Sequence, residues 1–257
     1  MSTARAAATT MTTATDIRTD PAPAAAATAT AVLLPLMWLA SPALPVGGFS
    51  YSEGLEAAVE HGLVHDEASA AAWLLSQTTL ALARADLPLL AQAHAAWAAH
   101  DLVRITALND WQRQSRETQE LRQQTEQMGR SLVEWLRNQA GSNGADDPRL
   151  RHLATLAPSP TWAIAFALAT ARADATAAQA LHASLFGWAE NMVQAALKAV
   201  PLGQLAGQRI LQALLERMPA LIESALALPF DDVQSFSPML GIASAQHETQ
   251  YSRLFRS

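Results

Sequence analysis

Apolar residues recur along most of this chain at the spacing of an α-helix. In the segment that ends before Pro201, Leu181, Leu185, Trp188 and Met192 form one stripe. Capping residues, glycines and prolines mark the boundaries of the other helical segments. The expected helices are 33–39, 50–61 (or 52–61), 66–84, 87–100, 101–111, 111–137, 160–173, 176–200, 202–218 and 219–228. The pattern therefore predicts an all-α, single-domain bundle of roughly ten helices.

Other segments lack this periodicity. Residues 1–31 are mostly Ala and Thr with few large side chains, which predicts a disordered leader before an all-helical domain at 32–257. Residues 138–148 are rich in Gly, Asn and Asp and are expected to form the main internal loop. From Pro229 onward the chain is expected to be an irregular C-terminal tail, with a short segment at 244–257.

Composition agrees with this picture and excludes several functions. Half of the 257 residues are hydrophobic, enough for one substantial core, and Ala and Leu favour helix. The absence of cysteine excludes disulfides, thiolate metal sites and a cysteine nucleophile. The net charge of -6 and the scattered basic residues argue against nucleic-acid binding. The apolar run 31–46 is broken by prolines and too short for a membrane span, so we expect a soluble cytoplasmic protein.

Common catalytic arrangements are missing from the sequence. His247 and Glu248 begin a zinc-protease pattern, but Tyr251 stands where the second histidine belongs. His61 and His65 are four residues apart, a spacing that permits weak metal binding, but Gly62 is expected to end the helix between them and leave surface histidines. We therefore predict no catalytic residue, no cofactor and no metal site.

Three segments carry residues that suit contacts with partner proteins. Phe49 and Tyr51 follow two glycines in a loop and are candidate anchors. Gly203 and Gly207 are expected to let helices pack closely, but the polar residues between and after them are hard to explain by packing. The aromatic residues near the C-terminus fit either a partner or docking on the chain's own core, and pattern alone leaves both open.

Several of these segments resemble the UreF family of urease accessory proteins. The match includes LASPALPVGGFSYSEGLE at 39–56, DLP at 86–88, residues 116–129, KAVPLGQ at 198–204, GQR at 207–209 and QYSRLFRS at 250–257. The resemblance implies an all-helical, dimerising, non-catalytic protein. It also implies two partners, the nickel-carrying GTPase UreG and the scaffold UreD or UreH, in a complex that couples GTP turnover to nickel delivery into apo-urease.

The resemblance also suggests which residues contact these partners. The C-terminal residues are expected on the scaffold side and Lys198, Gln204 and Arg209 on the GTPase side. With the glycine loop, the candidates are Phe49, Tyr51, Glu53, Lys198, Gln204, Arg209, Tyr251, Arg253, Leu254, Phe255 and Arg256. Arg209 is the first candidate, before Arg253, for an arginine that completes the GTPase site, although an interface ion pair is the commoner role. The alternative function is a small nickel carrier that uses His61 and His65.

Overall fold

Helices provide all the regular secondary structure in the part of the chain that the structure describes, so the predicted all-α class is confirmed. This computed structural model describes residues 23–144 and 147–256, with the backbone alone at 23–30 and 140–144. The α-helices are α1 Pro23–Leu39, α2 Leu55–Glu60, α3 Glu67–Gln77, α4 Leu87–Ala98, α5 Leu102–Gln114, α6 Gln119–Gly144, α7 Pro148–Thr155, α8 Trp162–Arg172, α9 Ala177–Ala199, α10 Gln204–Ala227 and α11 Pro238–Glu248. The shorter elements are η1 Gly48–Ser50, the π-helix η2 Thr78–Asp86 and η3 Phe230–Asp232.

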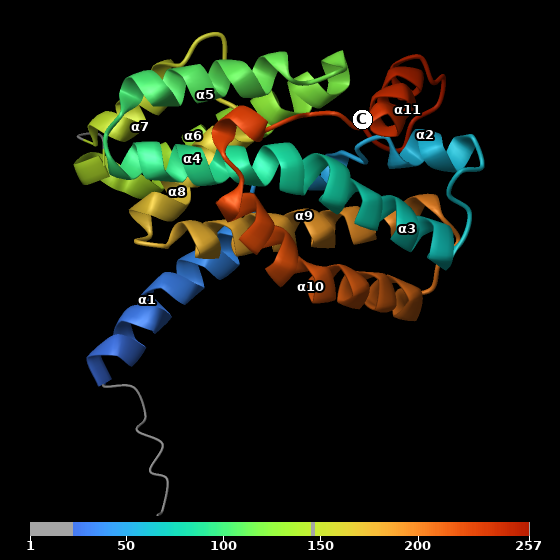
Figure 1. Cartoon of the computed structure of the whole chain (residues 1–257), viewed down its shortest axis with the longest axis horizontal. Coiled ribbons are helices and arrows are strands. Elements are labelled where there is room, and N and C mark those ends of the chain that lie inside the picture. The colour runs from blue at the N-terminus through green and yellow to red at the C-terminus, as the bar shows by residue number, and fades with distance from the viewer. Residues whose placement is uncertain (1–22, 145–146, 257) are drawn as a thin grey trace, which may run out of the picture.

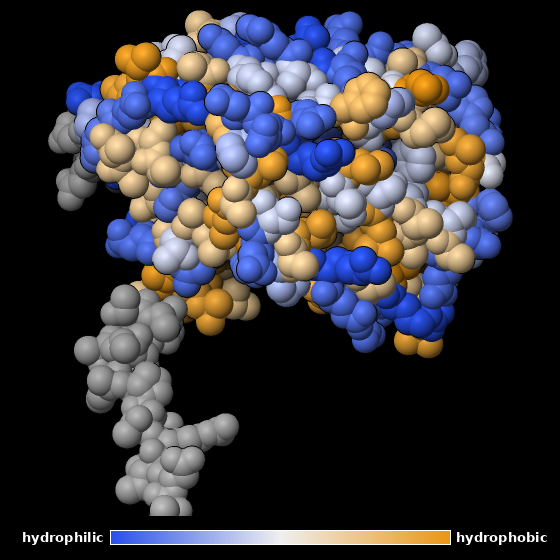
Figure 2. Space-filling view, viewed as in Figure 1, coloured by the Kyte–Doolittle hydropathy of each residue, from blue (hydrophilic) through white to orange (hydrophobic). Residues whose placement is uncertain are grey.

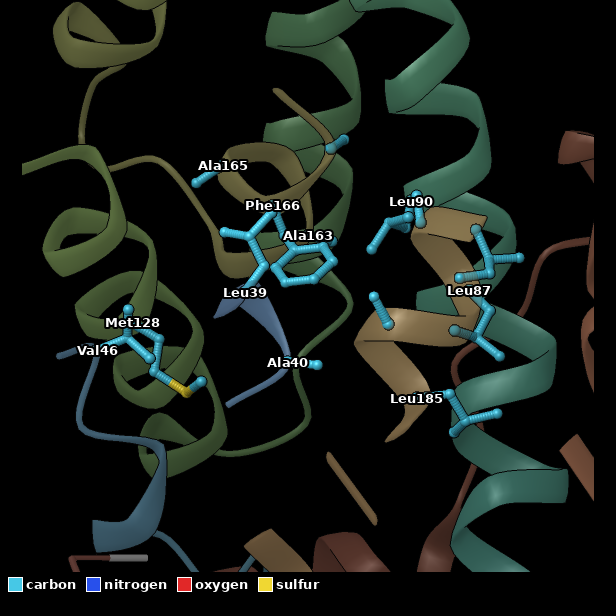
Figure 3. Close-up of a cluster of buried hydrophobic side chains, with 14 of the residues drawn as sticks. Leu39, Ala40, Val46, Leu87, Leu90, Met128, Ala163, Ala165, Phe166 and Leu185 are labelled. Atoms are coloured by element: carbon cyan, nitrogen blue, oxygen red, sulfur yellow. The ribbon is translucent and has the colours of Figure 1, made fainter. Parts of the chain in front are cut away.

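The core is built around α8, whose residues 163–170 are all buried. This helix packs against α4 and α6, while α9 packs against α10 and α4. Figure 3 shows Phe166 of α8 beside Leu39 of α1, and Val46 beside Met128 of α6. The buried Trp97 ring donates a hydrogen bond from Nε1 to the Ile164 carbonyl oxygen at 3.0 Å, which joins α4 to α8. Segments far apart in the sequence thus share one core.

The first helix begins earlier than the sequence pattern predicted. Residues 23–31, assigned above to the leader, form the first turns of α1, and residues 1–22 lie outside the described part. Successive alanines have the highest helix propensity, which accounts for the longer helix. α1 leaves the body of the bundle at one corner (Figure 1), and Figure 2 shows apolar residues gathered where it meets the body. An apolar groove lies there between α1 and α9.

The expected helix 111–137 is two helices, α5 and α6, separated at residues 115–118. Thr118 Oγ1 accepts a hydrogen bond from the Leu121 N–H at 3.2 Å, so a residue expected inside the helix starts a new one. Ion pairs link this region to other parts of the chain. Arg113 of α5 pairs with Glu126 of α6 at 2.8 Å and Arg116 pairs with Asp86, whereas Glu126 and Arg130 pair within α6 at 3.8 Å.

Other boundaries also differ from the prediction. The expected loop 138–148 is largely helical, because α6 continues to Gly144 and α7 starts at Pro148. The helix expected over 66–84 changes to a π-helix at Thr78. α10 passes through Pro219, where a break was expected. Pro219 removes the amide that would pair with the Leu215 carbonyl, but both residues are exposed, so the lost hydrogen bond lies on the solvent side of the helix.

Candidate functional site

Most of the residues singled out in the sequence meet at one end of the bundle. Figure 1 shows α2, α11 and the C-terminus at this end, together with the last turns of α9 and the start of α10. The Phe49 loop, residues 47–53, and the tail, residues 249–256, lie here side by side, because the Arg256 N–H donates to the Ser50 carbonyl oxygen at 2.8 Å. The site is therefore a surface formed by an N-terminal and a C-terminal segment of the sequence, which meet at one end of the bundle.

The Phe49 loop approaches α9 closely and presents one aromatic ring to solvent. Gly47 has a φ of 78°, and Gly48 lies against α9, where an added methyl group would be 2.9 Å from Asn191 Nδ2. The Phe49 side chain is 59% exposed, whereas Tyr51 is buried. The Tyr51 hydroxyl bonds the Arg256 side chain, and burial raises the pKa of this tyrosine above its ordinary value. Phe49 is thus available to a partner, and Tyr51 supports the loop.

Glu53, expected as a partner contact, turns its carboxylate toward the interior. Its two oxygens accept hydrogen bonds from Gln124 Nε2 at 2.7 Å and Trp188 Nε1 at 2.8 Å. Burial raises the pKa of Glu53, and these two hydrogen bonds oppose the rise. Its backbone has a φ of 50°, a value uncommon for residues other than glycine. In this structure Glu53 ties the loop to α6 and α9.

A small cavity lies beneath the loop. Its volume is about 120 Å³, and its polar wall includes Glu53, Asp86 and Arg116. The Asp86 carboxylate also accepts a hydrogen bond from Gln112 Nε2 at 2.9 Å. The Arg116 and Asp86 side chains are only 17% and 18% exposed, so this ion pair is held mostly away from water. The Arg116–Asp86 ion pair and the hydrogen bonds of Glu53 together support the Phe49 loop from the interior side.

The tail is anchored mainly by Glu56, a buried residue of α2. One Glu56 oxygen accepts the Leu254 N–H at 2.7 Å, and the other accepts the Phe255 N–H at 2.9 Å. Arg253 donates to Glu120 of α6 at 3.0 Å. Two carboxylates from separate helices thus hold three consecutive tail residues.

The tail side chains divide between the interior and solvent. Phe255 is 7% exposed and lies under Lys198, whose Nζ is 5.7 Å from the ring centroid. Tyr251 and Leu254 are exposed, Leu254 to 72%. Docking on the chain's own core therefore holds for Phe255, whereas Tyr251 and Leu254 face outward and stay candidates for a partner contact.

The segment from Lys198 to Arg209 joins α9 to α10 at the same end. Gly207 lies under Leu197, as expected for close packing, while Gly203 faces open space. The Gln204 side chain is exposed. Arg209 is exposed as well and makes two hydrogen bonds to Glu67 of α3, at 2.7 and 2.6 Å. These bonds raise the pKa of Arg209 and lower that of Glu67.

The histidines do not form a metal centre in the described residues, where no group of three or more His, Cys, Asp or Glu side chains is arranged so that it could hold a metal ion. Gly62, with a φ of 72°, follows the end of α2 as expected, and His61 and His65 are exposed on either side of it. His247 is fully buried and Tyr251 is fully exposed, so these two positions of the incomplete zinc pattern do not lie at a common site. Within the described residues, no helix is long and apolar enough to cross a bilayer.

Sequence reasoning missed the buried carboxylates Glu56 and Glu120. Both stand at helical positions whose neighbours face the core, and a charged residue on such a face is a signal for a buried partner. That partner is His247, whose Nε2 lies 3.1 Å from Glu56 and whose Nδ1 lies 3.0 Å from both oxygens of Glu120.

Comparison with known proteins agrees with the resemblance noted in the sequence. The family model UreF matches residues 64–215. The chain is also 59% identical over 225 residues to the urease accessory protein UreF of Methylibium petroleiphilum. The aligned region covers 88% of this chain and 94% of that protein. This chain belongs to the UreF family. UreF proteins of Paracidovorax citrulli and Polaromonas sp. are 58% and 57% identical, over 93% and 88% of the chain and 94% of each of those proteins.

Proposed function

We propose that this UreF-family chain is a urease maturation adaptor. It joins a UreG-type GTPase to a UreD- or UreH-type scaffold and couples GTP turnover to nickel delivery into apo-urease. The names of its relatives, urease accessory proteins, support the link to urease. The observation that carries the adaptor role is the anchored tail, which holds Tyr251 and Leu254 in solvent on a fixed backbone. Preorganised, exposed aromatic and aliphatic side chains are the usual anchors of protein interfaces.

The scaffold binds the tail surface, which we define as Tyr251, Leu254 and the neighbouring Phe49. Arg253 and Arg256 sit at its edge: Arg253 bonds Glu120, and the Arg256 backbone bonds the Phe49 loop. Phe255, Tyr51 and Glu53 act from the inside, by holding the tail and the loop in place. Apolar anchors surrounded by arginines match a scaffold surface that has apolar pockets with acidic residues around them.

The GTPase binds near Lys198, Gln204 and Arg209. All three side chains are exposed at the junction of α9 and α10. Arg209 is already paired with Glu67, so contact with the GTPase requires the arginine to exchange this carboxylate for a group of the partner. Replacing Arg209 with alanine is expected to lower GTP hydrolysis by the assembled complex without dissociating it, whereas Arg217→Ala, elsewhere on α10, should not. Equal hydrolysis by the two variants would remove Arg209 from the proposed GTPase contact.

The adaptor works in the cytoplasm as a homodimer and has no catalytic site of its own. Light scattering of the purified chain tests the dimer, and a monomer at every concentration would contradict it. No observation favours the alternative of a nickel carrier that uses His61 and His65. Nickel titration separates the two functions, because a carrier requires tight stoichiometric binding that is lost when both histidines are replaced.

Reconstitution tests the adaptor function as a whole. Apo-urease, nickel, GTP, the GTPase and the scaffold are mixed with or without this chain, and urease activity and GTP hydrolysis are measured. We expect activity to depend on the chain and on GTP together. Full activation without the chain, or activation by the chain without the GTPase, would overturn the proposal.

A further inference from the structure

His247 is a fully buried histidine with a carboxylate at each ring nitrogen. Nε2 faces Glu56 of α2 at 3.1 Å, and Nδ1 faces Glu120 of α6 at 3.0 Å. Both carboxylates are themselves surrounded by donors: Glu56 by the Leu254 and Phe255 amides, and Glu120 by Arg253. Two ionised carboxylates can both accept from the ring only if it donates at both nitrogens, as the doubly protonated imidazolium does.

Charge balance supports the same protonation state. The two negative carboxylates are matched by two positive groups, the imidazolium and Arg253. Glu248 at the end of α11 is a further carboxylate nearby, and it accepts the Glu120 backbone N–H at 3.0 Å. A neutral ring would direct a nitrogen lone pair at one of the buried carboxylates, and burial makes such an unpaired charge costly.

We propose that doubly protonated His247 is a positioning residue for the tail. It joins Glu56 and Glu120 into one unit, which we call the histidine clasp: Glu56, Glu120 and His247. The clasp fixes the Glu56 carboxylate that holds the Leu254 and Phe255 amides. With both amides held by this carboxylate, Leu254 faces outward and Phe255 faces inward. The importance of this arrangement for partner binding rests on the proposed function, but the clasp itself does not.

The protonation of His247 is measured directly by nitrogen NMR of the imidazole ring in the full chain, and the signals are assigned by their loss in His247→Gln. We expect both ring nitrogens to carry a proton while the tail is docked. A ring with one unprotonated nitrogen would overturn the proposal. The wild-type spectrum gives the protonation state, and the variant serves only to assign the signals.

Amide hydrogen exchange at Leu254 and Phe255 tests the positioning role. His247→Gln is expected to speed exchange at both amides by at least about tenfold, because Glu56 loses its charged partner. Glu56→Gln should do the same with the histidine in place. The control is His182→Gln, since His182 is exposed on α9 and bonds only the Ala178 carbonyl oxygen of its own helix among the contacts described.

Unchanged exchange in His247→Gln would show that the ring does not hold the tail. Circular dichroism of each variant separates local release from unfolding. If His247→Gln unfolds, Glu56→Gln replaces it as the probe, since it leaves the ring in place. Unchanged exchange in that variant would also count against the clasp. Scaffold binding is measured separately. A wild-type chain that does not bind the scaffold would contradict the proposed function but would not bear on the clasp.

Discussion

At the scale of single residues, buried carboxylates organise the candidate site. Glu53 was expected to contact a partner because it stands in a glycine-rich loop beside two aromatic residues. Helical periodicity does not extend into a turn, so the sequence did not specify the direction of this side chain. The two donors that receive it, Gln124 and Trp188, lie far away in the sequence.

The raised pKa of Glu53 predicts a pH-dependent effect of Glu53→Gln. The folded protein holds the Glu53 proton more tightly than the unfolded chain does. The wild type therefore loses stability relative to Glu53→Gln as pH rises from about 4 through the folded-state pKa of Glu53. Melting temperatures of both proteins at acid and neutral pH test this, with Glu60→Gln on the exposed end of α2 as a control. A wild type that gains stability relative to Glu53→Gln toward neutral pH would contradict the prediction.

A second residue-scale prediction compares two arginine–carboxylate pairs. Arg116→Ala leaves Asp86 without its cation in a mostly buried position, so we expect a loss of about 3 kcal/mol in the free energy of unfolding. Arg209→Ala removes an exposed pair and should leave stability almost unchanged. Urea denaturation measures both. Equal losses would mean that burial does not distinguish the two pairs.

At the scale of elements, the sequence predicted the long helices well because periodicity reports the face that meets the core. α9 was expected at 176–200 and spans Ala177–Ala199. Boundaries failed where the deciding contact comes from elsewhere. Thr118 starts α6 while its hydroxyl lies 2.7 Å from Ser244 Oγ of α11, a contact that no local pattern reveals.

The close approach of α6 to the segment before α8 predicts the effect of Gly129→Ala. An added methyl group would overlap the Pro160 carbonyl, a backbone atom that cannot move aside like a flexible side chain. We expect a loss of about 3 kcal/mol in the free energy of unfolding. Gly203→Ala is the matched control, since a methyl group there meets no atom within 4 Å. Equal stability of the two variants would contradict this view of the contact.

At the scale of the whole molecule, the predicted partner residues separate into a surface and its support. The sequence identified the Phe49 loop, the α9–α10 junction and the tail, and the structure brings them to one end of the bundle (Figure 1). It also places Tyr51, Glu53 and Phe255 inside, which the sequence could not distinguish from their exposed neighbours. Truncation of the last eleven residues would remove His247 together with the tail, so point variants are the better test.

The affinity of the scaffold for the full chain tests the central claim most directly. Calorimetry compares the wild type, the double variant Tyr251→Ala/Leu254→Ala and the control Val103→Ala, whose side chain is 83% exposed on α5. Removing two exposed anchors should weaken binding by about 100-fold or more and leave the melting temperature unchanged, while the control binds like the wild type. Equal affinity of all three proteins would contradict an adaptor that binds its scaffold through the tail surface.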